Sequence, residues 1–300
     1  MFGSSGCGAR RLPSISGRRC VVDDPLVRSR AAREAAERAL VRVVNHYGER
    51  PEFVVLGGLV PELLCAGSEF QHAGTIDIDV QVDLEIARGT VNTARLEQAL
   101  RDAGFAPENA AIWRWIADGG VGAPVVKFEL LADLHDVPAA ATISFDACED
   151  LGAVNLRGTG FAARDIEVRE LNIWDSDVTH TAEVKVSGLA GFLLAKTAAA
   201  FSRRKAKDWY DIAFVLLHND AGGTDAAAAL VEQRFIGEIA ALRTALADLE
   251  ANFENPAAQG SQAYVTQMRI DHPELDSRTL AADAIVAVGE FCQRLRDPAD

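Results

Sequence analysis

The fold is decided by FVVLGGL at residues 53–59 and TIDIDV at residues 75–80. The first stretch is a short apolar run bounded by a proline and a glycine, which is the pattern of a buried strand. It predicts a strand, a glycine turn and then a short helix at residues 60–66. The second stretch predicts another strand, at residues 76–82, whose side chains alternate between two faces.

The second strand carries two acidic side chains on one face. Because the side-chain period of a strand is two, Asp77 and Asp79 point one way and the isoleucines beside them point the other. Such a pair is costly on an otherwise apolar strand unless it binds a cation. The turn at Gly57 and Gly58 lets backbone approach a phosphate, and Thr75 opens the strand. Together these residues predict a Mg²⁺-dependent nucleotidyl-transfer site, with a tight turn plus two surface aspartates as the alternative.

A third carboxylate is expected in the strand predicted at residues 125–131. Period two places Lys127 and Glu129 on one face, so Glu129 is a candidate to join the two aspartates across the sheet. Asp133 lies on the same side, two positions beyond the strand, and remains a second candidate. A surface pair between Lys127 and Glu129 is the alternative interpretation.

The helical segment from Lys196 to Asp211, which begins in the helix predicted at residues 188–201, carries two basic side chains on one ridge. Lys196 and Arg203 stand at positions i and i+7, so they lie on one helix face. A lysine and an arginine suit a triphosphate, because lysine supplies a mobile point charge and arginine a two-pronged donor. In the alternative interpretation the two basic residues pair with Asp208 and Asp211 of the next helix, which is predicted at residues 207–218.

The chain divides into three parts by composition. Residues 1–22 are rich in glycine, serine and arginine without periodicity, which predicts a disordered leader. Residues 23–186 alternate between helix and strand patterns, whereas residues 187–300 are almost wholly helical in pattern. The predicted fold class is therefore α+β, with a mixed-sheet core followed by a helical C-terminal domain.

Further elements follow from periodicity and turn residues. The first helix is expected from an N-cap at Asp23-Asp24-Pro25 to about His46, where Gly48 ends it. A hairpin turn is expected at Asp118-Gly119-Gly120. The remaining predictions are helices at 91–103, 225–249 and 278–296, and strands at 112–116, 142–145, 166–171 and 183–186.

Composition limits the class of partner and the location. The 300 residues are 49% hydrophobic and 25% charged, as in soluble globular proteins, and no apolar run is long enough to span a bilayer. The formal net charge of −14 argues against a broad basic surface, so any contact with RNA must be local. The five cysteines have neither disulfide nor zinc spacing. We expect a cytoplasmic protein with no membrane partner.

The motifs, taken in this order, resemble the AbiEii/MenT nucleotidyltransferases, which are toxins of bacterial toxin–antitoxin systems. The resemblance runs from about Phe53 to Leu217 and covers the glycine turn, the acid strand and the helices with Lys196 and the late aspartates. It implies a nucleotidyltransferase core like that of DNA polymerase β, followed by a helical domain. It also implies an NTP substrate, Mg²⁺ as cofactor, an antitoxin encoded nearby, and a tRNA acceptor end as a target.

The resemblance also implies roles for individual residues. Asp77 and Asp79 match the metal-binding pair, with Glu129 as the further expected ligand. Lys196 matches the catalytic lysine, although Lys185 stays open as an alternative. The late aspartate is Asp208 or Asp211, of which Asp211 is assigned to catalysis. The expected nucleotide contacts are Gly57, Gly58, Thr75, Arg203 and Asp208. The chain departs from the family at Gly74, where an arginine is common, and in a longer gap between Gly58 and Asp77.

The expected function is transfer of a nucleoside monophosphate from an NTP to an acceptor hydroxyl. The favoured acceptor is the 3′ end of a tRNA, whose modification would inhibit translation. Nucleotidylation of a small molecule or a protein is one alternative, and a non-catalytic nucleotide-binding module is another. The sequence leaves open which NTP and which acceptor are used.

Overall fold

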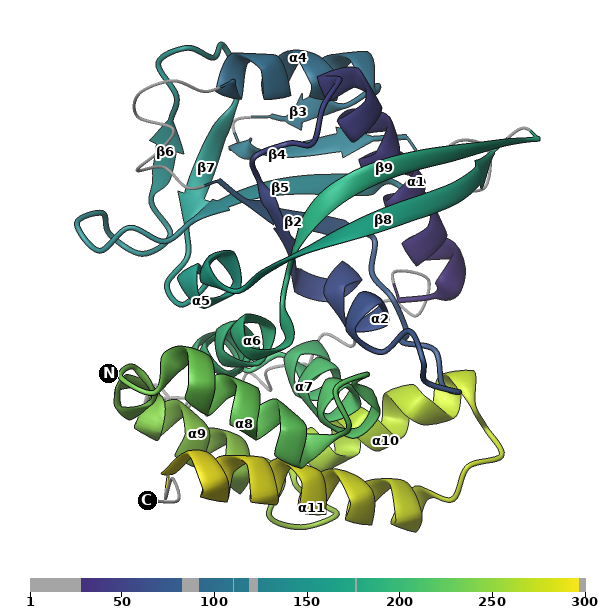
Figure 1. Cartoon of the computed structure of the whole chain (residues 1–300), viewed down its shortest axis with the longest axis vertical. Helices are drawn as coiled ribbons and strands as arrows, with labels where there is room; N and C mark the ends of the chain where they lie inside the picture. Colours follow the sequence, from purple (N-terminus) through teal and green to yellow (C-terminus); the bar gives the residue numbers. More distant parts are fainter. Residues whose placement is uncertain (1–27, 83–91, 110, 119–123, 176, 297–300) are drawn as a thin grey trace, which may run out of the picture.

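The computed structural model of the chain describes residues 28–82, 92–109, 111–118, 124–175 and 177–296. A sheet with helices packed on it forms one part of the molecule, and helices from the C-terminal part of the chain lie beside it (Figure 1). This arrangement confirms the predicted α+β class. The domain boundary at residues 186 and 187 stays a prediction. None of the described helices is long and apolar enough to cross a membrane.

Helix α1 (Arg30–Tyr47) begins later than the sequence predicted. Ser29 caps it, because its hydroxyl oxygen accepts a hydrogen bond from the Ala32 N–H at 3.2 Å. Gly48 ends the helix as predicted, in a left-handed conformation with φ of 81°. The N-cap expected at residues 23–25 lies outside the described residues, as does the expected leader.

In the part of the chain that the structure describes, nine strands form one mixed sheet. Its order is β3-β4-β5-β2-β1-β9-β8, and β7 joins the end of β5 and carries β6 on its other side. The strands are β1 (Val54–Leu56), β2 (Asp77–Gln81), β3 (Ala106–Glu108), β4 (Ala111–Ala117), β5 (Val126–Ala132), β6 (Thr142–Ser144), β7 (Gly152–Asn155), β8 (Ile166–Asp175) and β9 (Val178–Ser187).

The predicted strands are all present, but three details differ. Strands β3 and β7 were not predicted, because each is very short and lacks a run of alternating residues. Strands β8 and β9 pair antiparallel over ten residues each and are longer than predicted. Strands β4 and β5 are antiparallel, as a hairpin requires, but Gly119 and Gly120 of the expected turn lie outside the described residues.

Strand β2 lies between β1 and β5, and its register places the acidic side chains. It runs antiparallel to β1, with Leu56 opposite Asp79, and parallel to β5, with Glu129 opposite Asp79. Lys127 is opposite Asp77 in the same ladder. Because residues directly opposite each other point to the same face, the two aspartates, Lys127 and Glu129 share one face of the sheet.

The other face of the sheet is buried under helices. Helix α1 packs against β5, β8 and β9 and against α4 (Thr93–Asp102), which lies beside it over the sheet (Figure 1). Ile78, Val80 and Phe128 are fully buried in the hydrophobic core there. Each side chain of this kind stabilises the fold by roughly 2 kcal/mol. This burial fixes β2 so that its aspartates face away from the core.

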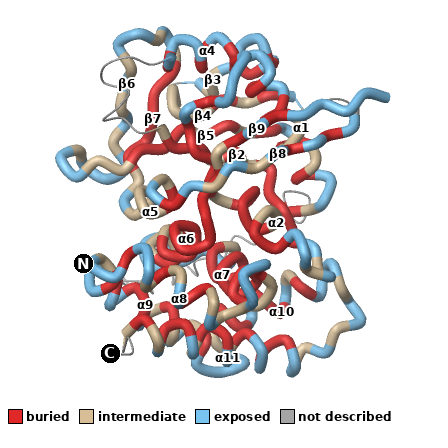
Figure 2. Tube along the Cα trace, in the orientation of Figure 1, coloured by how far each residue is buried: buried red, intermediate tan, exposed pale blue. Residues whose placement is uncertain are grey.

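The C-terminal helices approach the polar side of the sheet with α6 (Leu189–Arg203) and α7 (Ala206–His218) foremost (Figure 1). Figure 2 shows buried residues running through both helices. Between them, Arg204 reverses the chain in a left-handed conformation with φ of 49°. The other helical elements are η1 (Gly57–Leu59), α2 (Val60–Leu64), α5 (Gly160–Arg164), α8 (Thr224–Phe235), η2 (Ile239–Leu242), α9 (Arg243–Ala251), α10 (Gln259–Asp271) and α11 (Ser277–Arg296).

Two expectations about these helices were wrong. The alanine-rich stretch predicted as one helix at residues 225–249 is broken into α8, η2 and α9, because Gly237 and its neighbours form a turn. Helix α10 was not predicted, since its first turn contains Gly260 and Ser261, which are poor helix formers. The described cysteines Cys65, Cys148 and Cys292 are all free thiols.

Candidate active site

The glycine turn lies directly against the acid strand. Gly57 has φ of 74° at the start of η1, a conformation that favours glycine. A methyl group added there would lie 1.9 Å from Asp79 Oδ2, so only glycine leaves room for this carboxylate. A methyl group added at Gly58 would lie 2.8 Å from Cβ of Thr75. The structure therefore brings the predicted turn residues, Thr75 and the acid pair together.

Thr75 holds the entry to the acid strand in one conformation. Its hydroxyl oxygen accepts a hydrogen bond from the Asp77 N–H at 3.1 Å, a local turn that orients the first aspartate. Gly74, immediately before it, has φ of 74° and lies against α1. A methyl group added at Gly74 would lie 2.8 Å from Cβ of Arg33. This contact leaves no room for a side chain at position 74.

The three carboxylates of the acid face lie close enough to repel one another, and two of them have raised pKa values. Burial raises the pKa of Asp79, and the charge of Asp77 raises it further. Burial likewise raises the pKa of Glu129 to about 7, with repulsion from Asp79 as the next cause. Asp77 Oδ1 is buried and accepts no hydrogen bond from the described residues. Two adjacent carboxylates that repel each other, one of them with a buried oxygen atom that accepts no hydrogen bond from the described residues, fit a divalent cation.

Glu129 and Asp133, the two candidates for a third carboxylate, have different partners. Glu129 accepts a hydrogen bond from Arg114 Nε at 2.6 Å and lies beside Asp79 in the sheet. Asp133 accepts hydrogen bonds from the N–H groups of Gly158 and Gly160, at 2.9 and 3.0 Å, and so anchors the loop before α5. Among the described residues, no three His, Cys, Asp or Glu side chains converge closely enough to hold a metal ion. The fit to a metal therefore rests on the aspartate pair.

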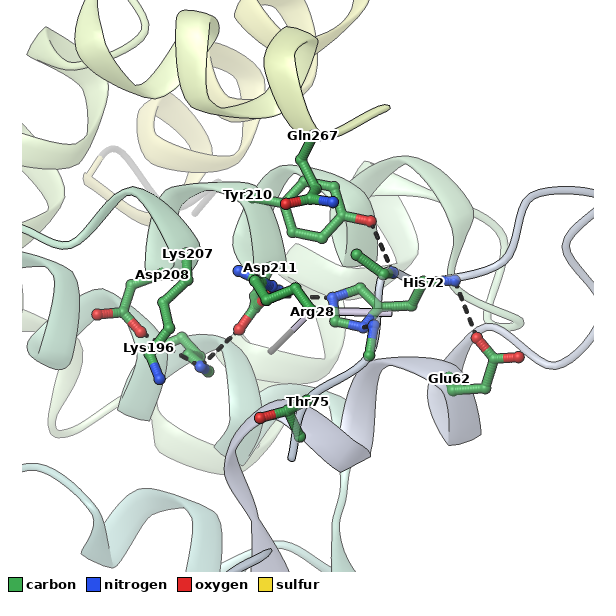
Figure 3. A network of polar contacts seen from close by, with 12 residues as sticks. Arg28, Glu62, His72, Thr75, Lys196, Lys207, Asp208, Tyr210, Asp211 and Gln267 are labelled. Carbon is green, nitrogen blue, oxygen red and sulfur yellow. Dashed lines mark hydrogen bonds and ion pairs between the residues drawn. The ribbon is translucent and has the colours of Figure 1, made fainter. Parts of the chain in front are cut away.

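Opposite the sheet, Lys196 is locked in a buried ion-pair network. Its ammonium donates to Asp211 at 2.7 Å and to Asp208 at 3.3 Å, as Figure 3 shows. Arg203 donates to both oxygens of Asp208 through Nε and Nη2, at 2.9 and 2.8 Å. Lys196 and both aspartates are almost fully buried, whereas Arg203 is partly exposed. The pairing that the sequence offered as an alternative is thus present.

Asp211 also holds two residues from far away in the chain. Arg28 donates to its Oδ1 at 2.7 Å, and His72 Nε2 lies 3.0 Å from the same oxygen (Figure 3). His72 accepts a hydrogen bond from the Gly74 N–H through Nδ1 and stacks on Tyr210. The loop before the acid strand is thereby fixed to α7, which also sets the position of Asp77 relative to the helices.

The cations of this network lower the pKa values of Asp208 and Asp211. Burial alone would raise the pKa of Asp211, but Lys196 and Arg28 outweigh it and hold that pKa well below its usual range. Burial would also raise the pKa of Asp208, which Lys196 and Arg203 lower. Burial lowers the pKa of His72, so this ring is neutral at pH 7. The two aspartates are therefore charged and act as the anchors of the cations around them.

Two lysines approach the acid pair itself. Lys127 Nζ of β5 lies 3.7 Å from Asp77 Oδ1, and Lys207 Nζ of α7 lies 3.6 Å from Asp77 Oδ2. Burial would lower the pKa of Lys207, but the charges of Asp79 and Asp77 raise it. Lys127 therefore pairs with Asp77 and not with Glu129, contrary to the alternative interpretation of that strand.

The two candidates for the catalytic lysine lie in different surroundings. Lys196 belongs to the network on α6 and α7, whereas the half-buried Lys185 lies on β9 opposite Val54, with β1 between it and the acid strand. Neither lysine forms an ion pair with Asp77 or Asp79 in the described structure.

Sequence reasoning missed the residues that join distant segments. These are Arg28, His72, Arg114, Lys127 as a partner of Asp77, and Lys207. A signal was available for Lys127, because a parallel register between the two predicted strands pairs it with Asp77. His72 and Asp211 are 139 positions apart, and no local pattern marks their contact.

Comparison with known proteins adds one match. A family model described as nucleotidyl transferase AbiEii toxin, type IV TA system, matches residues 38–287. This range begins within α1, ends within α11 and contains the acid strand, the glycine turn and the ion-pair network of α6 and α7. A search of curated proteins finds no match.

Proposed function

This chain belongs to the AbiEii family of nucleotidyl transferase toxins of type IV toxin–antitoxin systems, and from that premise we propose a specific reaction. The enzyme uses Mg²⁺ to transfer a nucleoside monophosphate from an NTP to the 3′ end of a tRNA in the cytoplasm, which inhibits translation. A cognate antitoxin is implied by the type of system.

The observation that carries the proposal is the aspartate pair beside the glycine turn. Asp77 and Asp79 share a face, Asp77 Oδ1 has no hydrogen bond among the described residues, and Gly57 touches the Asp79 carboxylate. The backbone of Gly57, which has no side chain, thus lies next to Asp77 and Asp79. A cation would relieve the repulsion between these two carboxylates. This combination supports binding of a metal-bound phosphate chain.

The reaction follows from these groups. The acceptor hydroxyl oxygen forms a bond to the α-phosphorus, the bond from that phosphorus to the β-phosphate oxygen breaks, and pyrophosphate leaves. Asp77 and Asp79 would hold Mg²⁺, which would supply positive charge to the triphosphate and lower the pKa of the attacking hydroxyl. Glu129 has a pKa of about 7 beside the pair, which suits a group that accepts the hydroxyl proton at neutral pH.

The basic network on α6 and α7 supports the same chemistry from the facing side. Arg203 uses Nε and Nη2 for Asp208, and its Nη1 has no hydrogen bond among the described residues, so this nitrogen can donate to a phosphate oxygen. Lys196 has two buried carboxylate partners and keeps Asp208 and Asp211 in place. We assign Lys196, Asp208 and Asp211 to positioning, and Arg203 to phosphate contact.

Label transfer tests the metal-site residues. Wild-type enzyme with total tRNA and Mg²⁺ is expected to incorporate label from [α-³²P]NTP but not from [γ-³²P]NTP. Asp77→Asn should reduce incorporation by at least about 10³-fold, because the reaction needs the cation that this carboxylate holds. The matched control is Asp102→Asn, an exposed aspartate at the end of α4. Equal labelling by Asp77→Asn and wild type, with both folded by circular dichroism, would refute the assignment.

The acceptor and the metal are tested with the same label. Lysate is separated into RNA, protein and small-molecule fractions after reaction with each of the four NTPs, and label is expected in tRNA. Label in the other fractions would support nucleotidylation of a protein or small molecule, which the net charge of −14 favours over RNA. EDTA should abolish incorporation and Mg²⁺ should restore it. A reconstituted translation reaction reports whether labelled tRNA is inactive.

A further inference from the structure

Besides Arg28, which is bound to Asp211, four cationic side chains of the described residues lie around the acid pair and the network behind it, and they differ in how tightly carboxylates hold them. Lys196 has two buried carboxylate partners, at 2.7 and 3.3 Å, and is almost fully buried. Arg203 is bound through two nitrogens to Asp208. Lys127 and Lys207 approach Asp77 only at 3.7 and 3.6 Å, which is beyond hydrogen-bond distance. Of these four side chains, the two lysines are therefore the ones without a hydrogen bond to a carboxylate of the described residues.

These two lysines come from opposite sides of the site. Lys127 is the neighbour of Asp77 within the sheet, so its side chain rises from the same surface as the carboxylates. Lys207 comes from the first turn of α7 and reaches toward the sheet from the helical part. In Figure 3 its side chain lies beside the buried network without a hydrogen bond or ion pair to it. A ligand between the acid strand and α7 would thus meet Lys207 on the side facing the carboxylates.

The backbone of Lys207 is held in place by its neighbours in the chain. Asp208, the next residue, is completely buried and bound by Lys196 and Arg203. Arg204 reverses the chain before α7 in a left-handed conformation. Successive residues of a helix point about 100° apart, so anchoring Asp208 inward turns Lys207 toward the acid strand. The side chain of Lys207 is a quarter exposed. Its aliphatic part is flexible, whereas its backbone is held in place.

We propose that Lys207 binds the β- and γ-phosphates of the NTP and the pyrophosphate that leaves. This inference rests on the proposed function and names a phosphate-binding residue that the sequence did not single out. Once a divalent cation neutralises Asp77 and Asp79, the attraction that holds the Lys207 ammonium near Asp77 is lost. The ammonium then pairs with phosphate oxygens next to the cation, together with Nη1 of Arg203. Lys127 stays beside Asp77 because the ladder between β2 and β5 places the two residues directly opposite each other.

Binding measurements on folded full-length protein test this assignment without relying on turnover. Isothermal titration with Mg²⁺ is carried out with pyrophosphate, with each of the four NTPs, and with the corresponding NMPs. Lys207→Met should weaken binding of pyrophosphate and of the NTP by about tenfold or more, equivalent to about 1.4 kcal/mol. Binding of the NMP, which lacks the β- and γ-phosphates, should change less than about twofold. Lys207→Arg should recover most of the lost affinity, because it restores the charge.

Matched variants separate the possible outcomes. Lys127→Met removes the other lysine near Asp77 and should weaken pyrophosphate binding less than Lys207→Met does. Equal affinity of Lys207→Met and wild type for pyrophosphate overturns the inference and leaves the proposed function intact. If wild type binds neither an NTP nor pyrophosphate, the proposed function fails as well. If Lys207→Met does not fold, Lys207→Gln is measured in its place. A ratio of NTP affinity to NMP affinity that is the same in Lys207→Gln as in wild type would then overturn the proposal.

Discussion

Replacing Glu129 with glutamine should stabilise the protein above neutral pH while harming its function. Burial raises the pKa of Glu129 to about 7, from an ordinary value of 4.5, with repulsion from Asp79 as the next cause. At about 1.36 kcal/mol per pKa unit, this difference corresponds to on the order of 3 kcal/mol. The charged form of Glu129 is therefore a destabilising element that the active site retains.

The sign of the pH dependence follows from proton binding. Between pH 4.5 and 7 the folded protein holds a proton on Glu129 that the unfolded chain releases. The contribution of Glu129 to the free energy of unfolding of the wild type therefore falls as pH rises through this window, and stays lower above it. Glutamine carries no proton to lose, so Glu129→Gln lacks this component. The stability of the variant relative to wild type should rise by on the order of 3 kcal/mol between pH 4.5 and pH 8.

Urea unfolding followed by circular dichroism at pH 4.5, 6 and 8, in EDTA, measures this difference. The matched control is Glu108→Gln on the edge strand β3, which removes the other carboxylate bound to Arg114, at 3.0 Å. It reports the loss of an Arg114 ion pair away from the aspartates. A difference between Glu129→Gln and wild type that stays constant or shrinks as pH rises would refute the electrostatic reasoning. Label transfer by Glu129→Gln should fall by about 10²-fold or more if Glu129 accepts the proton.

Three further results are expected. Gly57→Ala should lower the free energy of unfolding by roughly 1–3 kcal/mol and abolish label transfer, because φ is positive and the added methyl group meets the Asp79 carboxylate; a normal urea midpoint with normal labelling would contradict the close approach. Asp211→Asn removes the negative charge that Lys196 and Arg28 share as a partner and should lower the free energy of unfolding by about 3–5 kcal/mol. A melting temperature equal to that of wild type would show that these two cations do not need the Asp211 charge. Because the pKa of Asp211 is held well below its usual range, its contribution to stability is present above about pH 4 and lost as pH falls below it; an acid-unfolding curve of Asp211→Asn as steep as that of wild type would exclude this contribution.

The sheet face of the site was predictable, because it depends on local periodicity. Alternation in β2 and β5 places Asp77, Asp79 and Glu129 on one face whatever the rest of the chain does. Their pairing across the ladder then needed only the parallel register that the structure has. The glycine turn was predictable for a similar reason, since Gly57 takes a backbone conformation that other residues disfavour.

The facing half of the site was not predictable in the same way. His72 and Arg28 reach Asp211 across 139 and 183 positions of sequence, and such contacts depend on how α1, the loop before β2 and α7 pack. The same limit hid helix α10, where Gly260 lies so close to Phe253 that an added methyl group would be 2.3 Å from its ring. Glycine there serves packing between elements, although by local propensity it argues against a helix.

The acid pair and its facing cation are supplied by widely separated parts of the chain. Asp77 lies on the central strand, while Lys207 lies on α7, which is made 130 positions later. A growing chain on the ribosome therefore carries the carboxylates long before it carries the cations that face them. A chain that ends before α6 has the carboxylates without Lys196, Arg203 and Lys207, so we expect it to lack nucleotidyl-transfer activity. Two pieces produced by cutting the chain between β9 and α6 are likewise expected to be inactive when separate, and activity that returns when they are mixed would show that the two sides of the site can assemble from separate chains.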